Sequence, residues 1–214
     1  MVKSMHILVL SDDKWHPAQV PQKGLVGLEK FGFEFDWVKN ANDWSAEQMA
    51  AYTAIILTKS NNVSSTDESS WMSDSVQQAF LDYVKNGNGM LVIHSGTAEY
   101  KQTAVLRALM GGVFSDHPDQ CPVMVEPLAG HPLTEESESF TLVDEHYMMD
   151  LDDDQADIFL YTKSEHGTQP GGWRRHEGNG RVCVMTPGHN LEVWQHRSYQ
   201  RLLLNALRWC SKIS

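Results

Sequence analysis

The sequence contains few cysteines, no long apolar run and comparatively little positive charge. Its three cysteines, Cys121, Cys183 and Cys210, are odd in number and widely spaced. This pattern matches neither a zinc-binding motif nor a disulfide framework. No stretch approaches the roughly 18 consecutive apolar residues that a membrane-spanning helix needs, and the first residues lack the apolar segment of a secretory signal peptide. We therefore expect a cytoplasmic protein with no membrane-bound segment.

The charge balance excludes two further classes of protein. Seventeen Lys and Arg against 28 Asp and Glu give a formal net charge of −11. A general nucleic-acid binder needs a basic face, and docking on an anionic membrane needs a basic cluster, so neither partner is expected. The hydrophobic fraction of 41% and the charged fraction of 21% are typical of a globular protein. Because no internal repeat or linker is evident, residues 1–214 are interpreted as a single domain.

Two periodicities alternate through the first half of the chain. Short apolar runs predict buried β-strands, the alternation of apolar and acidic residues in Phe33–Val38 predicts a half-buried one, and between the strands apolar residues recur at helical spacing. This alternation predicts a parallel sheet that is covered by helices on both faces. The expected strands are Met5–Leu10, Phe33–Val38, Ala54–Leu57 and Met90–Ile93, and the expected helices run from about Val20 to Phe31, from a capping Asp74 to Gly87, and over Ala104–Met110.

The second half of the chain has strand-like segments without long helices between them. Such a pattern favours hairpins or an antiparallel extension of the sheet. The glycine-rich stretch Gly167–Gly180 indicates a protruding loop or hairpin, and Ser198–Cys210 has the apolar stripe of a closing helix. The expected strands of this half are Val123–Val125, Phe140–Val143, Ile158–Tyr161 and Val182–Met185.

Three histidines follow the carboxyl ends of predicted strands. His16 lies after the first strand, His94 ends the strand Met90–Ile93, and His189 follows the strand that ends at Met185. Ligands of open parallel sheets bind beyond these strand ends, so parallel neighbours would bring the three imidazoles to one rim. The alternative is that each histidine only forms a hydrogen bond within its own turn. His117 and His131 precede prolines, which indicates a turn or the start of a helix.

A fourth polar group, Asp144 to Tyr147, follows the strand Phe140–Val143. Neutral imidazoles together with one carboxylate form a typical site for Zn²⁺ or another borderline divalent metal. The same groups could instead perform general acid–base chemistry, because histidine titrates near neutral pH. The residue types favour neither role over the other.

The order and spacing of several segments resemble the ThuA-like (trehalose-utilisation) family over most of the chain. The resemblance implies the fold of class I glutamine amidotransferases, a flavodoxin-like three-layer sandwich with a mainly parallel sheet. It also implies a sugar or keto-sugar substrate. The matching segments are Gly89–Gly96, Gly130–Leu133, Asp144–Tyr147, Trp173 through His189 and the C-terminal Asn205–Trp209.

The same resemblance refines the candidate residues. His94 stands where amidotransferases carry their nucleophilic cysteine, so thiol-based glutaminase chemistry is excluded. Ser95 is poorly supported as a nucleophile, because position 93 is Ile and the G-x-S-x-G elbow is absent. The family pattern favours Glu145 and Tyr147 as the inward-facing pair, which agrees with the alternation of side chains along a strand.

The leading hypothesis is an enzyme that isomerises or hydrolyses a sugar or keto-sugar. The alternatives are a non-catalytic sugar- or metal-binding module and an assembly subunit that retains only the fold. A homo-oligomer is compatible with the sequence, and no nucleotide cofactor is expected. The expected catalytic residues are His94, Glu145 and His189; the expected substrate-binding residues are Tyr147, His16, Trp15 and Trp173, with Trp194 as a further candidate; the expected ligands of a divalent metal are His16, His94, Glu145 and His189.

Overall fold

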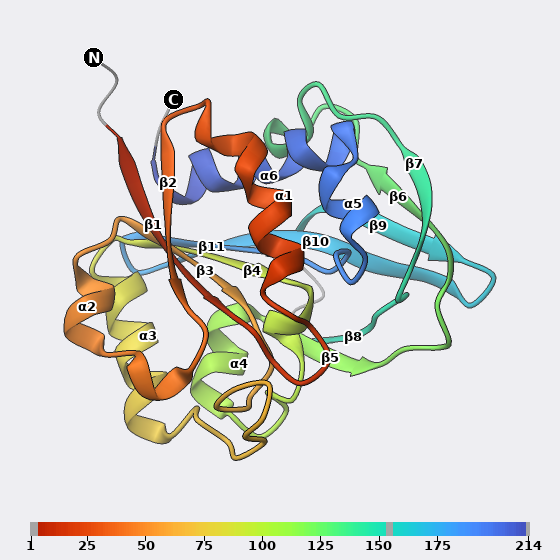
Figure 1. Ribbon diagram of the computed structural model, residues 1–214. Helices are drawn as coiled ribbons and strands as arrows, with labels where there is room; N and C mark the ends of the chain where they lie inside the picture. The colour runs from red at the N-terminus through yellow and green to blue at the C-terminus, as the bar shows by residue number, and fades with distance from the viewer. Residues whose placement is uncertain (1–3, 153–155, 213–214) are drawn as a thin grey trace.

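A nine-stranded sheet forms the centre of the computed structural model, which describes residues 4–152 and 156–212 (Figure 1). The strand order is β2-β1-β3-β4-β11-β10-β9-β6-β7. The first five strands in this order are parallel, and each pairing from β11 onward is antiparallel. The sheet is therefore mixed, which corrects the expectation of a mainly parallel one.

The parallel half contains the four strands that the first half of the sequence predicts. β3 and β4 are apolar on both faces and buried at every position, as central strands of a covered sheet should be. The edge strand β2 instead alternates apolar residues with the exposed Glu34 and Asp36. The four strands share one sheet, as expected. The parallel strands are β1 (Met5–Ser11), β2 (Phe33–Val38), β3 (Ala54–Thr58), β4 (Gly89–Ile93) and β11 (Gly180–Met185).

The antiparallel half consists of β6 (Cys121–Pro127), β7 (Phe140–Asp144), β9 (Asp157–Ser164) and β10 (Gly167–Glu177). Of the two alternatives for Gly167–Gly180, the hairpin is confirmed, because β10 pairs antiparallel with both β9 and β11. The protruding loop is wrong, because β10 is an inner strand of the sheet. Its proline and glycines form an irregularity in which the register shifts between Pro170 and Trp173. Glycine inside a strand often marks such a bulge, which from sequence alone resembles a turn.

Helices cover both faces of the sheet (Figure 1). α1 (Gln19–Glu29), α5 (Leu191–Gln195) and α6 (Arg197–Cys210) lie on one face, and α2 (Ala46–Ala50), α3 (Asp74–Lys85) and α4 (Ala104–Met110) lie on the other. Each face has its own buried apolar cluster. The cap of α3 is Ser73, whose Oγ accepts a hydrogen bond from the Val76 amide, and not Asp74 as expected.

The remaining elements are short. The strands β5 (Gly112–Asp116) and β8 (Met148–Leu151), which the sequence did not predict, form a separate antiparallel pair. Short 3₁₀ helices lie at Ala41–Asp43, His94–Thr97 and Pro132–Thr134. The second of these follows β4 directly and is fully buried. The chain turns here against the carbonyl of Leu57, where only Gly96 leaves enough room.

Candidate functional site

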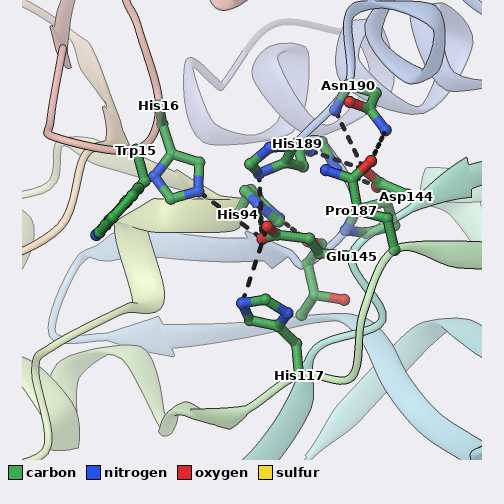
Figure 2. Close-up of polar contacts among 12 residues, drawn as sticks. Trp15, His16, His94, His117, Asp144, Glu145, Pro187, His189 and Asn190 are labelled. Atoms are coloured by element: carbon green, nitrogen blue, oxygen red, sulfur yellow. Dashed lines mark hydrogen bonds and ion pairs between the residues drawn. The ribbon is translucent and has the colours of Figure 1, made fainter.

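Four of the predicted site residues meet at the carboxyl edge of the parallel strands (Figure 2). His16 follows β1, His94 follows β4, and His189 follows β11. Glu145 comes from the segment between β7 and β8. One ligand atom from each of these four side chains lies within 4.8 Å of the other three. The expected convergence is therefore present in the structure, and the four residues are called the His–Glu cluster below.

One oxygen of Glu145 lies at the centre of the His–Glu cluster. Its Oε2 is 3.1 Å from Nδ1 of His189, 3.3 Å from Nε2 of His94 and 3.9 Å from Nε2 of His16. These three nitrogens are buried, and none has a hydrogen-bond partner of good geometry in the described part of the chain. Three imidazole nitrogens are thus directed at one point beside a carboxylate.

The opposite nitrogens of two of these rings are held by partners outside the cluster. Nδ1 of His16 is 2.7 Å from Oδ1 of Asp13, and Nδ1 of His94 is 2.8 Å from the carbonyl oxygen of Thr186. A carbonyl oxygen only accepts, so Nδ1 of His94 carries the hydrogen and Nε2 presents its lone pair to the cluster. Metal-binding histidines are usually oriented by a carboxylate or carbonyl in this way.

The backbone positions of these histidines are also tightly determined. His94 has φ of +47°, a left-handed conformation that is uncommon for a residue other than glycine. The hydroxyl of Thr97 donates a hydrogen bond of 2.8 Å to the carbonyl oxygen of His94. The surrounding structure therefore maintains a backbone conformation that costs energy, a feature that is frequent at functional sites.

Asp144 fixes the loop that carries His189. Its buried carboxylate accepts hydrogen bonds from the backbone amides of Gly188, His189 and Asn190 at 2.8, 3.0 and 3.1 Å (Figure 2). Burial raises the pKa of Asp144, and the amide hydrogen bonds oppose this effect. In the sequence Asp144 is only one member of the polar group after Phe140–Val143, and nothing local indicates its role in the His189 loop.

The charges of the site are strongly coupled. Burial alone would raise the pKa of Asp13, but the hydrogen bond and positive charge of His16, together with backbone amides, hold it at about 2. Burial would lower the pKa of His16, but Asp13 and Glu145 raise it to about 9. Burial lowers the pKa of His94. Glu145, despite its burial, has a pKa held well below the ordinary range by the three histidines. The site thus holds a negative charge that attracts a proton or another cation.

A cavity of about 550 Å³ opens beside the His–Glu cluster. Trp15 lines it and is 65% exposed, so its indole face is available to a ligand. Tyr147 also lines it and stacks on His94 with ring centroids 4.0 Å apart. The remaining lining residues are His16, Ser60, Ala98, Glu99, Phe114, His117, Glu145 and His189.

Two tryptophans that were candidates for sugar binding lie away from this cavity. Trp173 is buried in β10, where its indole nitrogen donates a 2.8 Å hydrogen bond to the carbonyl of Met110. Its assignment as a substrate-binding residue is therefore wrong, because the inner position of β10 places the ring in the core. Trp194 is fully buried and donates to the carbonyl of Gly188 at 2.7 Å, which stabilises the His189 loop.

The structure adds three site residues that the sequence analysis missed. Asp13 orients His16, Phe114 lines the cavity, and His117 faces Glu145 with its Nε2 3.8 Å from Oε1. The Asp-x-x-His spacing could have indicated the first, because Asp13 also accepts the amide hydrogens of Trp15 and His16. The His-Pro pair at residue 117 indicates a turn or the start of a helix, and nothing local points to a site residue.

These features define an α/β protein with a histidine–carboxylate cluster at the carboxyl edge of its parallel strands. A family model described as "ThuA: Trehalose utilisation" matches residues 6–210. The chain therefore belongs to the ThuA family. No curated protein sequence matches this chain.

Solved structures with a similar fold include other ThuA-like proteins. A ThuA-like protein from Parabacteroides merdae has a TM-score of 0.76 and 19% identity, over 98% of this chain and 90% of that one. A cytoplasmic protein from Salmonella typhimurium LT2 has a TM-score of 0.67 and 15% identity, over 96% of this chain and 99% of that one. At these identities the similarity establishes the fold alone.

The same fold is found within a larger enzyme. A β-galactosidase from Rahnella sp. R3 has a TM-score of 0.68 and 12% identity; the match covers 99% of this chain but only 32% of that one. Within residues 4–152 and 156–212, no helix combines the length and apolar character needed to cross a membrane.

Proposed function

We propose that this protein is an enzyme acting on a sugar or keto-sugar, and that it uses a divalent metal ion, Zn²⁺ or a similar one, bound by the His–Glu cluster. The observation that carries the proposal is the set of three buried, unpartnered imidazole nitrogens directed at Oε2 of Glu145. The sugar class is supported by the description of the family, trehalose utilisation. The proposal includes a cytoplasmic location, which the cysteine content favours.

The donor set fits a cation better than it fits a purely structural arrangement. A buried polar nitrogen without a hydrogen-bond partner costs about 1–3 kcal/mol, and the cluster contains three such nitrogens. Imidazole nitrogens and carboxylate oxygens are usual ligands of zinc, and a catalytic zinc keeps one position open for water or substrate. The cavity beside Glu145 provides access to such a position.

The residues around the cluster suit a sugar substrate. When bound, a divalent ion would polarise a carbonyl or hydroxyl oxygen of the substrate. Trp15 offers an exposed flat face to a sugar ring, and Tyr147 forms a wall of the cavity next to His94. Cys183 and Cys210 are fully buried in the core, where burial raises the pKa of both thiols, to about 12 for Cys210. These two thiols are therefore unsuited to nucleophilic chemistry.

The fold supports a more distant relationship as part of the same proposal. Five parallel strands with helices on both faces resemble the flavodoxin-like, three-layer core of class I glutamine amidotransferases. In that core His94, at the end of β4, would occupy the place of the nucleophilic cysteine. The amidotransferase-like scaffold would then carry a metal ligand where its relatives carry a thiolate.

Elemental analysis of the untagged protein tests the metal. We expect about one divalent ion per chain, or stoichiometric uptake of added Zn²⁺ by metal-free protein. His94→Ala and His189→Ala should each lower the affinity by about 100-fold or more, because each removes one donor. His166→Ala is the matched control, since this ring is partly exposed and does not belong to the cluster. A wild-type protein that takes up neither zinc nor another divalent ion would refute the metal proposal.

A substrate screen tests the rest of the proposal. Metal-loaded protein should convert trehalose or a ketone derived from it by oxidation of one ring hydroxyl. If Trp15→Ala abolished neither binding nor conversion of these sugars, the indole would have no part in substrate recognition. A metal-loaded protein that neither bound nor converted any sugar would overturn the substrate class.

A further inference from the structure

His117 lies on the wall of the cavity, in the loop between β5 and β6. Its Nδ1 is 2.8 Å from the carbonyl oxygen of Pro118. Because that oxygen only accepts, Nδ1 carries the hydrogen of the neutral ring, and Nε2 carries the lone pair. The side chain is 37% exposed, so the lone pair is accessible from the cavity.

Aromatic contacts hold this ring in place. His117 lies nearly parallel to Tyr147, with centroids 5.9 Å apart and an interplanar angle of 22°, and it also contacts Phe114 at 5.8 Å. Tyr147 in turn stacks on His94. His117 is thus connected by packing to the His–Glu cluster without belonging to the set of four ligand residues.

The two oxygens of Glu145 face different partners. Oε2 faces the three histidines of the cluster, whereas Oε1 is 3.8 Å from Nε2 of His117 (Figure 2). That distance is too long for a hydrogen bond, and a lone pair on each atom could not form one. A ligand bound in the cavity that both residues line can direct a hydrogen at either acceptor.

We propose that His117 is a catalytic residue that transfers a proton at a substrate carbon adjacent to a carbonyl group, which assigns the substrate to the α-hydroxy ketones. This inference rests on the proposed function, because it needs a keto-sugar in the same cavity. Nε2 removes the proton, the electron pair of the C–H bond forms the C=C bond of an enediolate, and the carbonyl π pair moves to oxygen. Return of the proton to the same carbon restores the ketone. Alternatively, the proton of the neighbouring hydroxyl group first moves to the former carbonyl oxygen. Return of the carbon-bound proton to the former carbonyl carbon then shifts the carbonyl group by one position.

The arrangement satisfies the requirements for such a step. A general base must have a free lone pair within reach of the hydrogen that it removes, and the tautomer of His117 provides one on the cavity side. The negative charge that develops on the substrate oxygen needs a cation or donor nearby, and the three histidines of the His–Glu cluster lie at the other oxygen of Glu145. Base and charge stabiliser thus face the same substrate from two sides.

Solvent deuterium exchange tests this step directly. The probe is trehalose oxidised to a ketone at one ring carbon, incubated in D₂O with the metal-loaded protein and followed by proton NMR. Wild-type protein should exchange the hydrogen next to the carbonyl. His117→Gln should slow this exchange by about 10²–10⁴-fold, with unchanged metal content and with affinity for the probe altered only a few-fold. Added imidazole should restore part of the rate, and His166→Gln should behave as wild type.

The outcomes separate this inference from the proposed function. Undiminished exchange by His117→Gln, or loss of the metal from that variant, would show that His117 is not the base. Hydrolysis of the probe to two monosaccharides without exchange would overturn this inference but leave a metal-dependent sugar enzyme. A wild-type protein that binds metal but leaves the probe unchanged would overturn the assignment to α-hydroxy ketones. A nitrogen NMR spectrum with the hydrogen on Nε2 of the neutral His117 ring would contradict the tautomer.

Discussion

Replacement of Asp13 by Asn should weaken both the fold and the site. The Asp13 carboxylate is 1% exposed; its Oδ1 accepts from the amides of Trp15 and His16 and contacts the His16 ring, and its Oδ2 accepts from the amide of Ser60 at 2.9 Å. The amide oxygen of an asparagine can replace Oδ1 as the acceptor for the first two amides. Its NH₂ group would then replace Oδ2 and face the Ser60 amide, so that two donors would lie opposite each other. The substitution also removes the charge that faces His16.

The magnitude follows from the pKa of Asp13, which is about 2 in the folded protein against a model-compound value of 3.8. A difference of nearly two pH units corresponds to about 2 kcal/mol of stability. Because the folded pKa is the lower one, this contribution is complete above pH 5 and is lost as the pH falls toward 2. Asp13→Asn should therefore lower the free energy of unfolding by about 2 kcal/mol at pH 7, and the deficit should shrink by about 1 kcal/mol at pH 3.

Urea unfolding of the metal-free proteins at pH 7, 5 and 3 measures this difference. Asp43→Asn is a suitable control, because Asp43 is an exposed carboxylate in the first 3₁₀ helix. In a separate titration with zinc, Asp13→Asn should bind about 10–100-fold more weakly, as expected when the partner that orients a ligand is lost. A deficit in stability that does not change with pH would refute the attribution to the carboxylate charge.

Four further predictions concern single features of the site and the core. His94→Ala and His94→Asn should both lower turnover by about 10²-fold or more, whereas a purely structural role predicts that Asn restores most of the activity. Trp15→Ala should change the free energy of unfolding by less than about 0.5 kcal/mol, because the side chain is 65% exposed, but should weaken sugar binding in calorimetric titrations. Metal affinity should increase about tenfold per pH unit up to pH 9 in competition with a chelator, since the His16 proton, with a pKa raised to about 9, must leave first. Cys183 and Cys210 should react with a thiol reagent only after unfolding, and rapid labelling of the native protein would contradict their burial.

The sequence predicts the parallel half of the fold well because its signals are local. β3 and β4 are short runs that are apolar on both faces, a pattern that few structures other than central parallel strands produce. Once these strands are parallel, topology brings their carboxyl ends to one edge. The proximity of His16 and His94 follows from that topology. The position of His189 also depends on the parallel pairing of β11 with β4, which the pattern of the second half of the sequence does not indicate.

The rest of the fold depends on contacts that no local pattern reveals. Gly171 and Gly172 look like a turn, yet β10 continues through them because they allow a bulge against β9. The same irregularity decides the position of Trp173, which packs into the core. An aromatic side chain with a polar atom suits a core, a pocket or a surface, so the sequence could not choose among them.

The residues that surround the His–Glu cluster illustrate the same limit at the site. His117 and Glu145 lie on different loops, and only their tertiary arrangement makes the former a candidate base. The sequence signal for His117, a histidine before a proline, is shared by His131. That residue instead caps the 3₁₀ helix at Pro132–Thr134 through its Nδ1. Identical local patterns thus have different roles.

The hydrogen bonds around the site run between its loops. Asp13, after β1, binds the amide of Ser60, after β3; Thr186, after β11, accepts from the ring of His94, after β4; and Asp144, at the end of β7, binds the loop of His189. Each loop that supplies a cluster residue is therefore held by a contact with another loop, so the orientation of one ligand depends on the others. If the cluster binds the proposed metal ion, changes at these outer partners should therefore reduce metal affinity even though none of them belongs to the cluster. The effects of Asp13→Asn and Asp144→Asn in one protein should be non-additive, because both variants loosen the same connected set of loops.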